Sequence, residues 1–144
     1  MTRTILMGGA LALIIGLGMT PAHAGGSTVT IEQYGYANAV GGGQNGWRNR
    51  LTVYQDGYGN TAISTQDGWR NRAVVGQSGH HNLADTYQRG RHNIVGVAQF
   101  GSHHTVLTTQ DGSGNAIGVI QAGRGNHATA TQIGAGNVTV IVQD

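Results

Sequence analysis

The chain of 144 residues contains no cysteine, no lysine and a single proline. The lack of cysteine excludes a disulfide scaffold and a cysteine-based zinc module. Charged residues make up only 10% of the sequence, which excludes the heavily charged surface that an ordinary soluble enzyme presents to water. The formal net charge of +2 rests entirely on arginine, so we expect no strong polyanion and no specific nucleic acid as a partner.

Glycine is abundant, with 26 residues, and Val, Ile and Thr recur throughout the chain. Disordered chains have few β-branched residues and a high net charge, and neither applies here. The composition therefore predicts an ordered, strand-rich protein.

Residues 1–24 have the pattern of a secretory signal peptide: a short basic start, an apolar run over residues 5–19 and an Ala-x-Ala site that ends at Ala24. The alternative, a transmembrane anchor, needs about 20 apolar residues, and this run is shorter and interrupted by glycine. We predict cleavage after Ala24 and a mature chain of residues 25–144. We expect no membrane span after this cleavage, because no second apolar segment follows.

A period of eleven residues governs the rest of the chain. Glutamine recurs at positions Gln33, Gln44, Gln55, Gln66, Gln77, Gln88, Gln99, Gln110, Gln121, Gln132 and Gln143. Glycine follows two residues later, at Gly35, Gly46, Gly57, Gly68, Gly79, Gly90, Gly101, Gly112, Gly123 and Gly134. Asparagine follows five residues after the glutamine, at Asn38, Asn49, Asn60, Asn71, Asn82, Asn93, Asn115, Asn126 and Asn137, with His104 as the one exception.

Charged residues do not occur at the glutamine, glycine or asparagine positions of the repeat. They are also absent from the positions two and four residues after the asparagine. The asparagine, these two positions and the next glutamine share one parity, as they would on one face of a β-strand. We therefore predict seven-residue strands from each asparagine to the next glutamine, such as 38–44 and 49–55, joined by tight arcs that contain the glycines. An eleven-residue repeat also fits a right-handed coiled coil, but a glycine in every unit disfavours a helix.

Two eleven-residue units make one rung, so each strand would stack in register on the strand two units later. This predicts an all-β solenoid of strand-arc-strand rungs over residues 25–144. Its repeats would span about 27–48, 49–70, 71–92, 93–114 and 115–136, with a half-repeat at 137–144. We predict that the glutamines form two buried amide ladders and that the asparagines form two more, because stacked identical amides satisfy one another.

The motif Ser27-x5-Gln33-x-Gly35-x-x-Asn38-x-Val40-x3-Gln44, repeated to residue 143, resembles the curlin repeat of curli, the functional amyloid fibres of bacterial biofilms. The resemblance implies a secreted β-solenoid subunit that forms cross-β amyloid on the cell surface, after passing through the periplasm. It also implies several partners: further copies of the chain, a second curlin subunit as nucleator or major subunit, an outer-membrane export pore and periplasmic accessory proteins. The short leader before the first strand departs from family members with a longer secretion-targeting segment.

Two groups of residues could carry additional chemistry. The segments Gly46-Trp47-Arg48-Asn49-Arg50 and Gly68-Trp69-Arg70-Asn71-Arg72 place both tryptophans and four arginines on one exposed edge. They could capture a polyanion or carbohydrate, but we favour stacking between adjacent rungs or a repeat duplication. A metal could bind six histidines, His80, His81, His92, His103, His104 and His127, yet no acidic or thiol partner recurs beside them. We favour the interpretation that they are solvent-facing arc residues and expect no metal, cofactor or catalytic site.

The function that we favour is a structural one: self-assembly into curli-like fibres for biofilm matrix, adhesion and surface attachment. A minor nucleating subunit that templates fibre growth is the alternative within the same class. A monomeric β-solenoid that binds a ligand such as carbohydrate or ice is a second alternative, although its outer face lacks regular threonine rows. An enzyme is the weakest alternative, because the chain has no long irregular loops to carry an active site.

Overall fold

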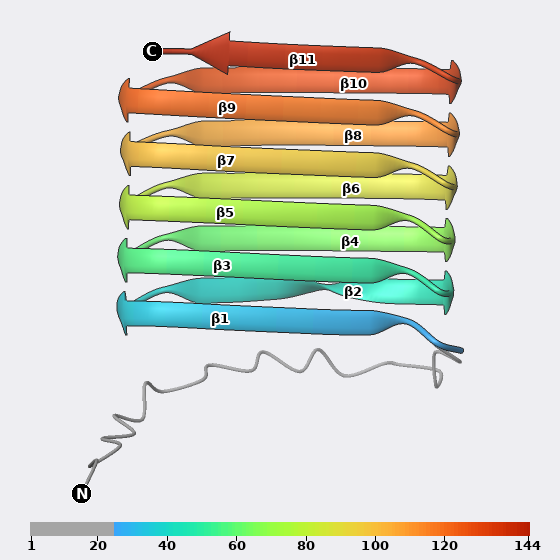
Figure 1. Cartoon of the computed structure of the whole chain (residues 1–144), viewed down its shortest axis with the longest axis horizontal. Coiled ribbons are helices and arrows are strands. Elements are labelled where there is room, and N and C mark those ends of the chain that lie inside the picture. The colour runs from blue at the N-terminus through green and yellow to red at the C-terminus, as the bar shows by residue number, and fades with distance from the viewer. Residues whose placement is uncertain (1–24) are drawn as a thin grey trace, which may run out of the picture.

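The computed structural model describes residues 25–144 (Figure 1). The predicted signal peptide, residues 1–24, lies outside the described residues. No helix able to cross a membrane occurs in residues 25–144. The described chain forms eleven strands: β1 (Thr28–Tyr36), β2 (Ala39–Trp47), β3 (Arg50–Tyr58), β4 (Thr61–Trp69), β5 (Arg72–His80), β6 (Leu83–Arg91), β7 (Ile94–Ser102), β8 (Thr105–Ser113), β9 (Ala116–Arg124), β10 (His127–Ala135) and β11 (Val138–Gln143).

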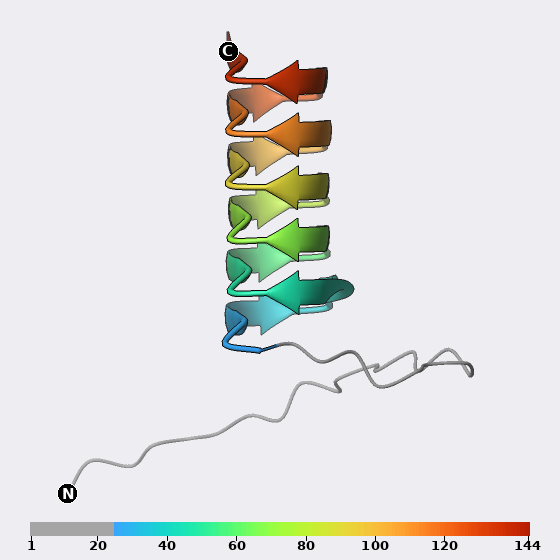
Figure 2. The same cartoon turned by 90° about the vertical axis from the view of Figure 1, so that its right-hand side faces the viewer.

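The strands form two parallel sheets that face each other across a thin core (Figures 1 and 2). The odd-numbered strands make a six-stranded sheet in the order β1-β3-β5-β7-β9-β11, and the even-numbered strands make a five-stranded sheet in the order β10-β8-β6-β4-β2. Neighbouring strands pair in register two repeat units apart, so that Gln33 lies beside Gln55 and Gly35 beside Gly57. The predicted all-β solenoid, with two units in each rung, is confirmed.

The strands are longer than the predicted seven residues. Most span nine, because ladder pairing continues past the glutamine and through the arc glycine to the residue after it, as at Gly57 and Tyr58 in β3. The unpaired connection shrinks to two residues, such as Gly59 and Asn60. The alternation of inward and outward positions in the sequence predicted where side chains stop pointing inward. It could not show that backbone pairing continues around the bend.

The core contains only the inward side chains of the two sheets. One column of the odd sheet consists of Val53, Val75, Val97 and Val119, all nearly inaccessible to solvent. Facing positions are filled by small residues such as Ala62 and by further aliphatic side chains, which completes a continuous apolar cluster. Because each level contributes so few side chains, the core is only one side-chain layer thick on each sheet.

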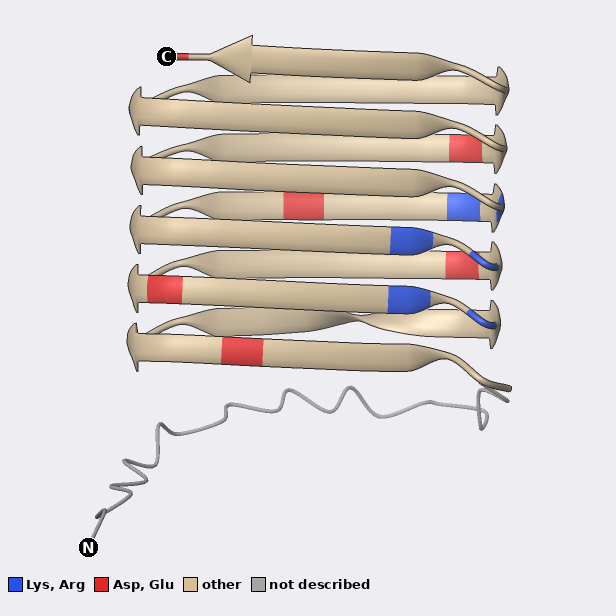
Figure 3. Cartoon of the chain, viewed as in Figure 1, with Lys and Arg blue, Asp and Glu red and all other residues tan. Residues whose placement is uncertain are grey.

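Charged residues are sparse and lie outside this core (Figure 3). The arginines gather at the edge where β2 turns into β3 and β4 turns into β5, while acidic residues are scattered over both sheets. The charge avoidance seen in the sequence is therefore the signature of the buried face.

Candidate functional site: the polar ladders and the open ends

Two ladders of glutamine side chains run the length of the solenoid inside the core. Each glutamine except Gln132 and Gln143 donates a hydrogen bond from Nε2 to Oε1 of the glutamine 22 residues later, over 2.6 to 3.0 Å. Six glutamines form the ladder of the odd sheet and five form that of the even sheet. Away from the ends, their side chains are at most 1% exposed. All donors point the same way, so both ladders have a direction.

The same amide nitrogens also join the two sheets. The Nε2 atom of each glutamine from Gln44 onward donates a second hydrogen bond to the backbone carbonyl 16 residues earlier, on the opposite sheet. Gln77, for example, bonds to the Thr61 carbonyl of β4 at 2.9 Å. Because a carbonyl can only accept, this contact fixes which end of the amide is the nitrogen. The direction of the ladders is thus set by the backbone.

The asparagines do not form the two self-ladders that we predicted. Their Oδ1 atoms accept from backbone N–H groups one rung later, as from Asn60 to Asn38 at 3.0 Å. Their Nδ2 atoms mostly donate to arc carbonyls, one in their own arc and one of a glycine in the next rung. Direct contacts between asparagine side chains occur only at Asn82 to Asn60 and Asn137 to Asn115 within the described residues. The asparagine lies at the end of each arc. There the backbone carbonyls of the bend need donors, so Nδ2 mostly bonds to them and not to the asparagine of the adjacent rung.

His104 takes the place of asparagine in one arc and reproduces two of the three bonds that an asparagine side chain makes there. Its side chain is fully buried. Its Nδ1 atom accepts from the backbone N–H of Asn126 at 3.2 Å, and its Nε2 atom lies 3.1 Å from the Phe100 carbonyl. This network assigns a neutral ring that carries its proton on Nε2. The one exception in the asparagine series therefore still bonds to the arc in the way that an asparagine does.

The arcs need two special backbone conformations. The first is at the repeated glycine: Gly79 has φ of 120°, and a Cβ there would collide with the Gly101 carbonyl oxygen of the next rung. The second lies two residues later, where the chain adopts the left-handed region. Glycine fills that position in four arcs, but six others hold non-glycine residues with φ between 54° and 59°: Ala37, Arg48, Arg70, His81, His92 and His103. This second requirement was missed from the sequence, although the glycines at positions 59, 114, 125 and 136 indicated it.

Comparison with known proteins agrees with this geometry. A family profile described as the curlin associated repeat matches residues 46–79, 79–110 and 105–134, which together cover well over half of the chain. The chain belongs to the curlin-repeat family. No curated protein matches it. Curlin-repeat proteins are structural subunits of curli-type amyloid rather than enzymes. In this chain the glutamines form the ladders, the glycines allow the bends and the asparagines bond to the arcs.

One edge of this curlin-repeat solenoid carries stacked aromatic rings. Tyr36, Tyr58 and His80 stack on consecutive rungs with ring centroids 5.2 and 5.0 Å apart. Beside them, His81 and His103 stack with centroids 5.2 Å apart. These pairs follow directly from the in-register stacking of rungs, which brings like positions together.

Folding lowers the pKa of His103. The first cause is loss of hydration, and the next is repulsion from His81, followed by Arg124, His80 and His104. Folding therefore favours the neutral form of the His103 ring.

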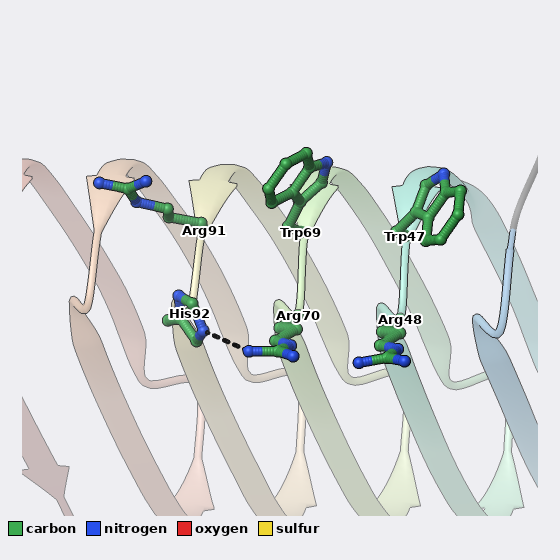
Figure 4. A pocket seen from close by; sticks show the side chains of 6 residues that line it. All are labelled: Trp47, Arg48, Trp69, Arg70, Arg91 and His92. Atoms are coloured by element: carbon green, nitrogen blue, oxygen red, sulfur yellow. Dashed lines mark hydrogen bonds between the residues drawn. The ribbon is translucent and has the colours of Figure 1, made fainter.

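The opposite edge carries the Trp47 and Trp69 segments (Figure 4). Here Trp47, Arg48, Trp69, Arg70, Arg91 and His92 line an open hollow of about 530 Å³. The two indole rings are exposed and point away from the solenoid, and no ring contact joins them within residues 25–144. The predicted stacking of these tryptophans is therefore wrong. Between rungs, the side chains of Arg70 and His92 approach each other, with Nη1 and Nε2 3.5 Å apart.

The two ends of the curlin solenoid expose unpaired strand edges. Within the described residues, β1 and β2 have a strand neighbour on one side only, and so do β10 and β11. Both ends expose apolar side chains among polar ones: Val29 is 52% exposed at one end, and Ile133 and Val138 are 76% and 73% exposed at the other. No groups of histidine, aspartate or glutamate able to hold a metal occur in residues 25–144.

Proposed function

We propose that this curlin-repeat chain is a secreted structural subunit that polymerises end to end into curli-like amyloid fibres for biofilm matrix and surface attachment. The observation that carries the proposal is the pair of open ends. Each end offers unpaired backbone groups and an unfinished glutamine ladder, and a further copy can complete both. Soluble solenoids normally cover such edges.

The interior of the solenoid supports this proposal because growth repeats contacts that already exist. A docked copy adds one more parallel, in-register interface of the kind that joins β3 to β5. Identical side chains then meet identical side chains, as in other cross-β assemblies. The predicted signal peptide and membership of the family support export and display on the cell surface.

Incubation of residues 25–144 at about 50 μM, a concentration at which exposed strand edges associate, tests this function. We expect unbranched fibres, a rise in thioflavin T fluorescence and fibre diffraction at about 4.8 and 10 Å. A monomer that persists for days would overturn the proposal. Adding the chain in substoichiometric amounts to another curlin-repeat protein distinguishes a nucleator from a major subunit.

An end-specific variant pair sharpens the test. Ile141 points inward on β11 and is only partly covered at the open end, so Ile141→Lys can hold its ammonium in water until a second copy covers it. Val142 points outward on the same strand and is 62% exposed. We expect Ile141→Lys to slow fibre elongation at least tenfold and Val142→Lys to leave it nearly unchanged. Equal elongation rates would contradict growth through this end.

A further inference from the structure

A stack of whole rungs would have its two outermost strands in different sheets. The number of described strands is odd, so both outermost strands of this solenoid lie in the same sheet. Successive half-units alternate between the sheets, and each is related to the next by a half-turn about the solenoid axis with a rise of half a strand spacing. The outermost strand at one end is β1 and at the other end β11, and both belong to the six-stranded sheet (Figure 1).

We propose that consecutive copies in the fibre are related by a half-turn about its axis, so that β1 of a second copy pairs with β10 and its β2 pairs with β11. This inference rests on the proposed end-to-end assembly and concerns a subunit made of these eleven strands. A copy stacked without rotation would place its β1 on β11. Its β2 would then face β10 across a missing strand, about 10 Å away, and both edges would stay unpaired.

The glutamine ladders favour the half-turn. At the C-terminal end, Gln132 and Gln143 lack the glutamine acceptor that the others have; Gln132 donates to Thr139 instead, at 3.0 Å. At the N-terminal end, Oε1 of Gln33 and of Gln44 has no glutamine donor within residues 25–144. With a half-turn, Gln132 meets Gln33 of the second copy and Gln143 meets its Gln44. Without rotation, only one of these two ladders continues.

The direction of the ladders also excludes assembly of like ends. Both terminal donors lie at one end and both terminal acceptors at the other, and contacts with the opposite sheet fix the amide orientation. Two C-terminal ends brought together would oppose donors to donors. The fibre is therefore polar, with one kind of junction throughout.

The side chains at this junction are complementary in size. Strand β2 contains Gly41, Gly42 and Gly43, and a hollow of about 570 Å³ surrounds them. A Cβ on Gly41 or Gly43 would meet nothing within 4 Å. The half-turn register sets these three glycines beside Val140, Ile141 and Val142 of β11, a run of aliphatic side chains. The large side chains of β11 thus fill the space that the glycines of β2 leave open.

The other strand pair of the junction also gains contacts. On β10, Ile133 is 76% exposed, and the half-turn places Tyr34 of the second copy, itself 55% exposed, directly beside it. Aromatic residues and β-branched residues form favourable pairs between neighbouring strands. Glu32 of the second copy lies beside Thr131, so no like charges meet.

The chain also enters β1 in the conformation that this register needs. Gly26 has φ of 70° and takes the left-handed arc position. Ser27 takes the asparagine position, because its Oγ accepts from the backbone N–H of Asn49 at 3.1 Å. The residues before β1 therefore already form the second half of an arc that comes from the level of the opposite sheet. With a half-turn, β11 of the neighbouring copy occupies that level.

Cysteine crosslinking tests the half-turn cleanly, because the natural chain has no cysteine. The half-turn places Thr30 of one copy beside Thr129 of the next, whereas stacking without rotation places Thr30 beside Val140. All three residues are exposed and point outward. Neighbouring in-register positions are close enough for a disulfide. The variants Thr30→Cys/Thr129→Cys and Thr30→Cys/Val140→Cys of residues 25–144 form a matched pair.

After assembly and mild oxidation, we expect Thr30→Cys/Thr129→Cys fibres to give a ladder of covalent multimers on a non-reducing gel. Thr30→Cys/Val140→Cys fibres should give at least tenfold fewer. The three single-cysteine variants measure crosslinks that arise from lateral contacts between fibres. Labelled fibres provide a second readout: gold on Arg91→Cys should alternate between sides with an axial step of about 26 Å per subunit, eleven half-spacings of the sheet.

The outcomes separate the two proposals. Crosslinking of the Thr30/Val140 pair alone, with labels on one side only, overturns the half-turn and leaves the proposed function standing. Fibres in which neither pair crosslinks overturn the in-register junction. If the wild-type chain forms no fibres at all, the proposed function itself fails.

Discussion

The buried glutamine ladder gives the sharpest prediction about assembly, at Gln77 in the middle of the solenoid. Gln77 accepts from Gln55 at 2.7 Å and donates to the Thr61 carbonyl at 2.9 Å and to Oε1 of Gln99 at 2.8 Å. Gln77→Leu removes the donor from two buried acceptors, while the Gln55 amide keeps its bond to a backbone carbonyl. At about 1 to 3 kcal/mol for each unsatisfied buried group, the loss of stability is about 3 kcal/mol.

Gln77→Glu is expected to cost more, although it is the closer match in shape. A carboxylate still accepts from Gln55, but its second oxygen faces the Thr61 carbonyl and Gln99 Oε1, which can only accept. The charge is also buried without a cation, a penalty of several kcal/mol. The total loss is therefore at least about 5 kcal/mol. Val74→Glu, on the same strand but 42% exposed and pointing outward, is the matched control.

The assay compares fibre growth by thioflavin T and the guanidinium midpoint for fibre dissociation among these variants. We expect the order wild type, Val74→Glu, Gln77→Leu and Gln77→Glu, from most to least stable. Lowering the pH should partly rescue Gln77→Glu, because a protonated carboxyl group can donate one bond. Equal midpoints for Gln77→Leu and Gln77→Glu would refute the reasoning that a carboxylate at this position is buried, without a cation and against groups that can only accept.

Three further changes test the arcs and the core. Gly79→Ala should block folding, because its Cβ would strike backbone of the next rung, while Gly96→Ala, with nothing within 4 Å, should stay near wild type; circular dichroism distinguishes them. Thr108 carries the buried Oγ1 that has no hydrogen-bond partner among the described residues, so Thr108→Val should raise the stability measured by guanidinium unfolding by about 1 kcal/mol; a loss of stability would indicate a hidden partner. Because folding lowers the pKa of His103 below 6.5, the unfolded chain binds more protons between the two pKa values, and stability should fall as pH drops from about 7 to 5. His81→Asn/His103→Asn should flatten that pH profile, and an unchanged profile would show that carboxylates dominate it.

The sequence sufficed for the register because the repeat has no insertion: once Gln33 stacks on Gln55, all later pairings follow. The inward columns were predictable for a related reason, since burial excludes charge, and excluded charge is visible in a sequence. The extent of each bend was harder to predict from the sequence. Backbone pairing through Gly57 depends on φ values that no side-chain pattern encodes, and only the recurrence of glycine hinted at them.

The roles of the polar side chains were predictable only in part. Glutamine and asparagine carry the same amide and repeat equally well, so the pattern suggested ladders for both. The shorter Asn60 side chain instead reaches arc carbonyls that the longer Gln66 side chain passes by. Similarly, Trp47 and Trp69 repeat in register as Tyr36 and Tyr58 do, yet only the tyrosines stack. Ring orientation depends on the local arc, which the period does not specify.

The odd number of half-units has an evolutionary consequence. A duplication or deletion of one whole rung, such as one that would produce the identical segments at positions 46–50 and 68–72, leaves both outermost strands in the same sheet. The junction between copies would survive such an event. A gain or loss of a single half-unit would instead move one outermost strand to the other sheet and change the symmetry of the whole polymer. Length variation in the lineage of this chain is therefore expected to proceed in steps of whole rungs, with the half-rung inherited unchanged.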